Sequence, residues 1–184
     1  MQRVQNLWVG GYRSFELQIF KDDDPKAKVI EDFLEMRLRD YCEKGLKWIL
    51  TGAQLGIEQT TVRVAKRPIF QEYQLQTAVI LPFEGMADRW NDQNKQRFSQ
   101  TVQTTDYFNS VSHTGYQGPQ QFKNWQQFML SHTDGSFFVY DLDVPGKCQY
   151  EYMAITQYQK YHDYDCQLAS FYDLQDFVND RQEF

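Results

Sequence analysis

The chain has 184 residues, of which 41% are hydrophobic and 16% aromatic, a composition typical of a folded protein and unlike that of a disordered tail. Its formal charge of −6 excludes a general electrostatic attraction to nucleic acids or anionic lipids, so that any anion site must be local. The length fits one domain with a sizeable core.

The first predicted elements are a short strand and a long amphipathic helix. Residues 7–9 form an apolar run that closes at Gly10 and Gly11. A helix is expected to begin near Pro25, because the aspartates before it supply an N-cap and proline suits the first helical position. The buried face of this helix, which ends before Gly45, is a stripe of apolar residues at helical spacing: Ile30, Phe33, Leu34, Leu38 and Tyr41.

The next segment repeats this order of strand and helix. Residues 48–51 are an apolar run, and residues 57–65 have an inner face at helical spacing until Pro68 ends the pattern. Residues 77–81 are β-branched or apolar without interruption and end at Pro82. This pattern predicts a strand that is covered on both faces of a parallel sheet.

The second half of the chain continues the alternation. In chain order we expect a helix over 88–103, a strand over 107–112, a helix from Pro119 to Asp134, a strand over 136–141, a helix over 150–161, a strand over 167–171 and a short helix from Asp173. Strands separated by helices of about 10 to 15 residues imply right-handed crossovers. The predicted fold class is therefore α/β, with a three-layer, doubly wound, mainly parallel sheet.

The strongest functional signal is the junction between the strand 48–51 and the helix 57–65. Gly52 and Gly56 indicate a tight turn, where free backbone N–H groups and the positive end of a helix dipole favour phosphate as the ligand. Glu58 is negative where a phosphate would lie, so it is expected to face a sugar hydroxyl or to cap the helix. The glycine spacing argues against a classical NAD dehydrogenase, and a structural turn is the alternative.

The other strand ends carry groups that suit a nucleotide. After the first strand, Tyr12 could stack on a base and Arg13 could bind a phosphate, with a tight turn as the alternative. Phe83 and Trp90 could line a pocket, although such aromatics more often belong to the core. His113 is placed for a hydrogen bond to a ligand rather than for catalysis. The candidate ligand-binding residues are Gly10, Gly11, Tyr12, Arg13, Gly52, Gln54, Gly56, Glu58, Pro82, Phe83, Trp90, His113, Tyr116 and Asp141.

Carboxylates could act as general acid or base if two of them converge, which the sequence alone cannot show. The candidates for such a pair are Glu58, Asp134, Asp141 and Glu151. Exposed acids are the usual case in a chain this acidic, so no catalytic residue is assigned, with Glu58 as the choice if the protein is an enzyme.

The cysteines indicate a reducing compartment and do not form a pattern typical of a metal site. Cys42, Cys148 and Cys166 are far apart and no histidine lies at ligand spacing from them, so we expect free thiols and no bound metal. The first residues lack a signal-peptide pattern and no run reaches transmembrane length. We expect a cytoplasmic protein that does not insert into membranes.

A family resemblance follows from these motifs. The segment Thr51-Gly52-Ala53-Gln54-Leu55-Gly56-Ile57-Glu58 resembles the Ser-Gly-x-x-x-Gly-Ile-Asp signature of the DNA-processing protein DprA. That protein belongs to the SLOG superfamily of Rossmann-like nucleotide-binding domains, which also contains the LOG phosphoribohydrolases. The whole chain resembles the YpsA family of Firmicutes within this superfamily, through residues 11–17, 54–58, Pro82-Phe83, His113, Tyr116, Gln121-Phe122 and Tyr140-Asp141.

The resemblance implies one Rossmann-like nucleotide-binding domain over residues 1–184. It also implies a nucleotide ligand, such as ADP-ribose or a NAD-derived molecule, held by the first two glycine loops, and loosely a role in cell division or stress signalling. The LOG enzymes continue with Pro-Gly-Gly-x-Gly-Thr-x-x-Glu after a later strand. Residues 144–151 here read Val-Pro-Gly-Lys-Cys-Gln-Tyr-Glu, which lacks the second half of that loop and argues against hydrolase activity.

Three functions are therefore carried forward. The leading hypothesis is a cytoplasmic, non-enzymatic nucleotide sensor that acts on a regulatory or cell-division partner. The alternative is a hydrolase of N-glycosidic or phosphoester bonds that uses Glu58. Single-stranded DNA binding with Tyr116 and Trp125 as stacking platforms is the weakest, because the chain is acidic. Homo-oligomerisation stays open, and no cofactor other than such a nucleotide is assigned.

Overall fold

The computed structural model describes residues 3–182 and contains a six-stranded sheet in which all paired strands are parallel. The strands are β1 (Asn6–Gly11), β2 (Trp48–Thr51), β3 (Gln76–Phe83), β4 (Tyr107–Ser112), β5 (Gly135–Val139) and β6 (Asp165–Ala169), in the order β4-β3-β2-β1-β5-β6. The helices are α1 (Pro25–Glu43), α2 (Ile57–Ala65), α3 (Asp92–Thr104), α4 (Gln120–Ser131), α5 (Gln149–Tyr158) and α6 (Phe171–Gln182), with a 3₁₀ turn η1 (Pro68–Phe70) after α2. This arrangement confirms the predicted Rossmann-like α/β class.

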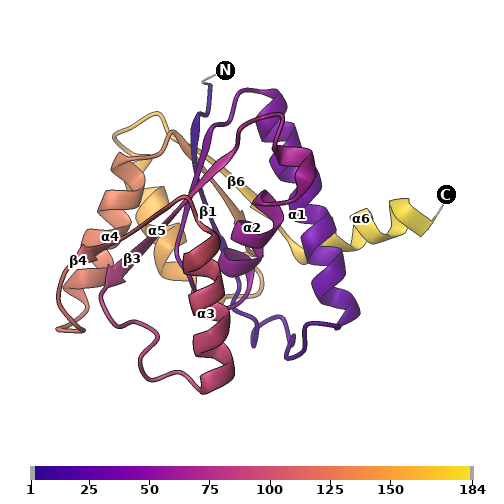
Figure 1. Ribbon diagram of the computed structural model, residues 1–184. Coiled ribbons are helices and arrows are strands. Elements are labelled where there is room, and N and C mark those ends of the chain that lie inside the picture. Colours follow the sequence, from indigo (N-terminus) through magenta and orange to yellow (C-terminus); the bar gives the residue numbers. More distant parts are fainter. Residues whose placement is uncertain (1–2, 183–184) are drawn as a thin grey trace.

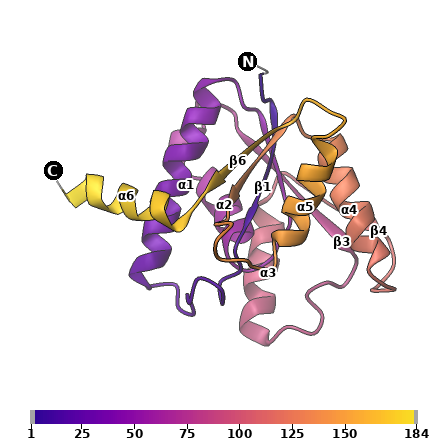
Figure 2. The ribbon, with the colours of Figure 1, turned by 180° about the vertical axis from the view of Figure 1, so that it is seen from behind.

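The helices form two layers around the sheet (Figures 1 and 2). Helices α1, α2 and α3 follow one another on one face, and α4 and α5 pack together on the other. The C-terminal α6 contacts both α1 and β6. The division follows from right-handed crossovers, because the chain winds from β1 to β4 in one direction and then returns past β1 to β5.

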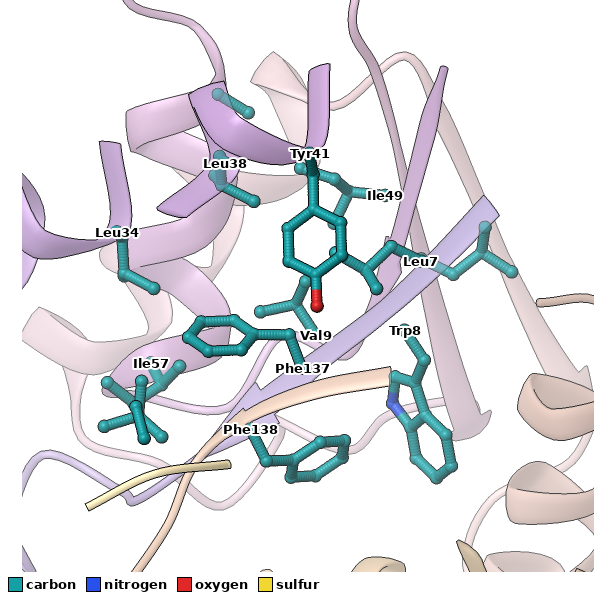
Figure 3. Packing of buried hydrophobic residues seen from close by; sticks show 14 of the residues in the cluster. Leu7, Trp8, Val9, Leu34, Leu38, Tyr41, Ile49, Ile57, Phe137 and Phe138 are labelled. Carbon is teal, nitrogen blue, oxygen red and sulfur yellow. The ribbon is translucent and has the colours of Figure 1, made fainter. Parts of the chain in front are cut away.

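The core has two faces because neighbouring strand residues point to opposite sides of the sheet. Leu7 and Val9 of β1 face α1, whereas Trp8 lies on the opposite side with Phe138 (Figure 3). The Trp8 and Phe138 rings meet edge to face with centroids 5.3 Å apart. The α1 stripe predicted from the sequence is buried along its length against this sheet.

Several element boundaries differ from the predicted ones. Gly10 and Gly11 pair with β5, so β1 continues through them and does not close before them. β3 continues through Pro82 to Phe83, which is tolerated because β2 ends at Thr51 and leaves that side of β3 without a partner strand. α3 begins at Asp92, since Asn91 caps it by accepting a hydrogen bond from the Asn94 N–H.

The last elements also shift by a few residues. β5 covers Gly135–Val139, and its parallel register with β6 places β6 at Asp165–Ala169, earlier than the predicted strand 167–171. α5 and α6 begin before their predicted starts, at Gln149 and Phe171. Between residues 3 and 182, no helix combines the length and the hydropathy that crossing a bilayer requires.

The carboxyl ends of the strands are stepped, and this step positions the site. The last pair of β2 is Thr51 with Val79, whereas β3 runs on to Phe83 and β1 runs on to Gly11. The loop after β2 therefore begins before the carboxyl ends of β1 and β3, the strands on either side of it. The strand order reverses between β1 and β5, which is the general location of ligand sites in open α/β sheets.

Candidate functional site

The two glycine loops predicted from the sequence meet directly. Arg13 and Gly56 form an isolated antiparallel bridge, in which the Ser14 N–H donates to Leu55 O at 3.1 Å and the Ile57 N–H donates to Tyr12 O at 3.1 Å. Gly56 has a φ of 110°, and a Cβ there would lie 2.4 Å from Tyr12 O. Glycine is therefore required at position 56 for both its conformation and its space.

Some of the backbone amides that were expected to face a ligand form hydrogen bonds within the protein, and others have no acceptor. The Gln54 N–H donates to the Glu58 carboxylate at 2.7 Å, so Glu58 holds the turn as a cap, one of the two roles expected for it. Among residues 3–182, the N–H groups of Leu55 and Gly56 have no acceptor, and both residues are partly exposed. Successive amides of this kind can bind an anion.

Beside this loop, one arginine faces two buried carboxylates. Arg13 Nη2 lies 3.6 Å from Glu151 Oε1, and Arg13 Nη1 donates to Gly11 O at 3.3 Å. Glu58 comes from the first turn of α2 and Glu151 from the first turn of α5, and they are only 3% and 7% exposed. Of the carboxylates considered from the sequence, Glu58 and Glu151 are the pair that converges.

The charges of this cluster are tightly coupled. Burial raises the pKa of Glu151 to about 7, with the negative Glu58 adding to the shift and Arg13 opposing it. Burial likewise raises the pKa of Glu58, against the opposing effect of Arg13. Burial disfavours the charge of Arg13, but the two carboxylates outweigh it and raise the pKa of the guanidinium. One cation thus lies between two acids whose pKa values are both raised, that of Glu151 to about 7.

The space at the switch point between β1 and β5 is filled by Tyr12. Its hydroxyl accepts a hydrogen bond from the Asp141 N–H at 2.9 Å and donates to Val144 O at 2.6 Å. Its ring stacks on Phe171 with centroids 5.0 Å apart. Burial raises the pKa of Tyr12 to about 12, so the hydroxyl stays neutral. The Tyr12 ring is therefore packed within the protein and presents no free face to a base.

Glu16 joins the same loops across the switch point. Its carboxylate accepts hydrogen bonds from the Arg13 N–H and the Lys147 N–H, each at 2.8 Å. The Asp141 carboxylate accepts from the Phe171 N–H at 3.2 Å and lies at the start of α6. Both acids hold loops together rather than facing the solvent.

Three further glycines have packing reasons of their own. A Cβ at Gly10 would lie 2.5 Å from the Phe138 ring, and one at Gly11 would lie 2.6 Å from Val139 O. A Cβ at Gly52 would lie 2.6 Å from Glu58 Oε2, so the missing side chain makes room for the buried carboxylate. Their presence at strand ends is explained without close approach of a ligand.

The remaining candidates form a second group at the ends of β3 and β4. Phe83 contacts the rings of Tyr116 and Phe122, with centroids 5.3 and 5.6 Å away, and Tyr116 is 60% exposed. His113 is exposed and lies 3.4 Å from Glu84 Oε1. Pro82 is buried in β3 below this group.

The glycine loop after β2 contacts the loop after β3, which leads away from this second group. The Gln54 side-chain amide lies 3.4 Å from Met86 Sδ, which joins the glycine loop to that segment. Trp90 precedes α3 and packs edge to face on Phe98 of that helix, with centroids 5.9 Å apart. The structure thus brings together Arg13, Gln54, Gly56 and Glu58, and leaves Trp90 apart.

One expectation about a single residue is wrong, and one of the four candidate acids lies apart from the others. Trp125 is not an exposed stacking platform, because it is 4% exposed and its Nε1–H donates to Ile80 O at 2.8 Å. Asp134 does not approach the other acids, since its carboxylate accepts hydrogen bonds from the Gln5 and Asn6 N–H groups at the opposite edge of the sheet. Both side chains have structural roles.

Sequence reasoning missed three contributors to the site. Glu16 and Leu55 belong to no motif that marks a binding site. Glu16 contributes its carboxylate, which joins two loops, and Leu55 contributes only its backbone amide, which does not depend on residue type. Glu151 was considered as an acid or base but was not chosen as a site residue. The available signal was its position at the end of the segment 144–151, in the first turn of α5. Cys148, which caps α5, is fully buried, and burial raises the pKa of its thiol to about 12. Residues 3–182 hold no cluster of three or more His, Cys, Asp and Glu that could bind a metal.

The comparison with protein families agrees with this geometry. A family model described as the YspA SLOG family, YpsA, matches residues 7–174, a range that covers β2 to β6 and all of β1 except Asn6. The chain belongs to the YpsA family of SLOG proteins. The YpsA resemblance inferred from residues 51–58 and the other motifs is therefore confirmed.

Relatives in this family are similar over almost their whole length. A UPF0398 protein of Lactobacillus helveticus is 45% identical over 181 residues, which are 98% of this chain and 95% of the relative. UPF0398 protein LBA1157 of Lactobacillus acidophilus is 42% identical, with 98% and 96% covered, and UPF0398 protein SH1465 of Staphylococcus haemolyticus is 37% identical, with 97% and 96% covered. Membership in a SLOG family connects the chain with a nucleotide-related function.

Proposed function

We propose that this chain is a nucleotide-binding protein that senses ADP-ribose, a NAD-derived molecule or a similar nucleotide at the carboxyl ends of β1 and β2. The single observation that carries the proposal is the pair of open amides at Leu55 and Gly56, held next to Arg13 by the bridge between the glycine loops. Two N–H donors and a guanidinium are a suitable set for a phosphate.

Each residue of the site has a distinct part in this proposal. The Leu55 and Gly56 amides donate to phosphate oxygens, and Arg13 supplies the positive charge. Glu58 is a positioning residue, because its carboxylate fixes Gln54 and thereby the amides that follow. The exposed His113 and Tyr116, both in the loop after β4, offer contacts to the rest of the ligand.

The charge coupling gives ligand binding a specific signature. A phosphate that competes for Arg13 withdraws part of the positive charge from Glu58 and Glu151. The pKa values of both acids then rise further. Because the pKa of Glu151 is about 7, the protein takes up protons at this residue when the ligand binds near neutral pH. A ligand bound elsewhere on the surface would leave this balance unchanged.

The experiment is calorimetric titration with ADP-ribose, NAD and AMP at pH 7, in two buffers of different ionisation enthalpy. We expect saturable binding of at least one compound, with proton uptake that is lost in Glu58→Gln together with most of the affinity. Glu72→Gln is the matched control, because it removes the same charge from an exposed position. Failure of all three nucleotides to bind the folded protein, or equal affinity in Glu58→Gln, would contradict the proposal.

A hydrolase is the second candidate, and one observation favours it. Glu58 and Glu151 converge beside the proposed phosphate position, and the pKa of Glu151 near 7 suits a general acid or base. Chromatography after incubation with the same nucleotides distinguishes the two functions. Product that forms with the unaltered protein and not with Glu58→Gln or Glu151→Gln would establish turnover, whereas binding without product supports the sensor.

The biological setting belongs to the same proposal. We place the protein in the cytoplasm, since Cys42, Cys148 and Cys166 are free thiols that suit a reducing compartment. A regulatory partner in cell division or the stress response rests on the family resemblance. Binding of the nucleotide would act on such a partner through the loops that Glu16 and Tyr12 hold together.

A further inference from the structure

A cleft adjoins the strand-end site and is lined by residues of α1, α2 and α3. These helices cover one face of the sheet (Figure 1). It has a volume of about 590 Å³ and is bounded by these three helices and by residues of the segment 14–22. Its apolar lining includes Leu17, Ile30 and Leu55. The volume falls within the range of about 300 to 1,000 Å³ that small-molecule sites occupy.

Cations outnumber anions around this cleft. Its lining includes Lys21, Arg63, Lys66 and Arg97, against Asp22 and Glu31. The whole chain has a formal charge of −6, so the lining of this cleft differs in sign of charge from the protein as a whole. An anion is therefore favoured here over a cation or a neutral compound.

Lys21 is exposed and forms no ion pair within residues 3–182, and of the three lining cations that are paired, Arg97 has the most exposed partner. Arg63 is bound to Glu31 with an N–O distance of 2.9 Å, and Lys66 is bound to Asp106. The partner of Arg97 is Asp22, at 3.1 Å, whose side chain is 89% exposed. An ion pair with so exposed a partner contributes little to stability, so another acid can replace Asp22 at small cost.

An aromatic ring is also available at the edge of the cleft. Phe20 lines the cleft and is 67% exposed, which is unusual for a side chain of this size. A flat ligand could pack on this ring and on the apolar floor, and a guanidinium stacks on aromatic faces as well as binding acids.

We infer that this cleft binds a small planar aromatic anion, whose acidic group replaces Asp22 on Arg97 while its ring packs against Phe20, Leu17 and Ile30. The site adjoins the proposed phosphate site but uses other binding groups, because its cation comes from α3 and its aromatic residue from the segment before α1. The two sites share Leu55 and Gly56 as a common wall. Variants distinguish the two sites: Glu58→Gln removes the carboxylate that holds the phosphate loop, whereas Arg97→Gln removes a cation that belongs to the cleft alone.

The test uses 8-anilinonaphthalene-1-sulfonate as a fluorescent aromatic anion, titrated into the full-length protein. We expect one saturable site that Arg97→Gln weakens about tenfold, the loss that removal of a charged hydrogen bond produces. Ala27→Trp should abolish binding by filling the cleft, because Ala27 lines it and is partly exposed. Arg39→Gln is the matched control and should bind like the unaltered protein, since Arg39 pairs with Glu43 at the end of α1.

The outcomes separate the alternatives. Circular dichroism first establishes that each variant is folded. Probe binding that is not saturable, or that neither Arg97→Gln nor Ala27→Trp changes, would overturn the proposal. Displacement by phenyl phosphate supports an aromatic anion, and stronger displacement by octyl phosphate would overturn that class in favour of an acyl anion. Displacement by AMP that persists in Glu58→Gln would support the cleft as an aromatic-anion site and would count against the strand-end location of the nucleotide.

Discussion

Arg13 and Arg97 are both paired with carboxylates, but the two pairs differ in what surrounds them. Arg13 lies among buried acids at the strand ends, with Glu58 3% and Glu151 7% exposed. Arg97 lies at the rim of a cleft, and its partner Asp22 is 89% exposed. How far the partner carboxylates are buried determines how much stability the protein loses when the arginine is removed. At the strand ends the loss leaves charges without water, whereas at the cleft it leaves a solvated acid.

The largest expected effect is the loss of Arg13. Arg13→Met leaves Glu58 and Glu151 buried without a cation, and we expect a loss of about 3 to 5 kcal/mol in the free energy of unfolding at pH 8. The loss should shrink at pH 5, below the pKa of about 7 at which Glu151 becomes neutral. Urea denaturation at both pH values measures it. An equal and small loss at both would mean that the acids are not coupled to Arg13.

The next effect isolates one acid of the cluster. The folded-state pKa of Glu151 is about 7, above its ordinary value of 4.5, so the folded protein binds an extra proton between these pH values. The stabilisation from the neutral acid is complete below pH 4.5 and is lost as the pH rises through 7, by up to about 3 kcal/mol.

Glu151→Gln should remove this loss and flatten the stability profile between pH 4.5 and 8. Thermal or urea unfolding of both proteins across that range provides the comparison. Glu72→Gln serves as the control, because its side chain is exposed. A variant profile parallel to that of the unaltered protein would contradict the assigned coupling.

A backbone change tests the bridge that supports the strand-end site. Gly56→Ala places a Cβ 2.4 Å from Tyr12 O at a φ of 110°, and we expect a loss of about 2 kcal/mol together with the nucleotide affinity. Gly115→Ala is the matched control, since no atom lies within 4 Å of its added Cβ. Equal stability of the two variants would show that the loops do not depend on this contact.

The smallest effect completes the comparison of the two arginines. Arg97→Gln should change the free energy of unfolding by less than about 0.5 kcal/mol, because its pair with Asp22 is exposed. The same variant should lose most of its affinity for the aromatic anion. A large loss of stability would mean that Arg97 supports the fold rather than a ligand.

The sequence by itself determined the alternation of elements, the parallel sheet and the family. The apolar stripe of α1, the runs at 48–51 and 77–81 and the motif at 51–58 are local patterns, and local patterns are set by residue type and spacing. It also identified Arg13, Gly56 and Glu58 as residues of one edge, since carboxyl ends of parallel strands share an edge.

Only the tertiary structure decided how those residues meet. The contact of Arg13 with Glu151 joins positions far apart in the chain, and Tyr12 fills the switch point through bonds to Asp141 and Val144. Burial, which raises the pKa values of both acids, and the cleft beside Arg97 also depend on packing between elements. Spacing along a chain does not specify these distances, because they arise from the register of strands and the packing of helices on the sheet.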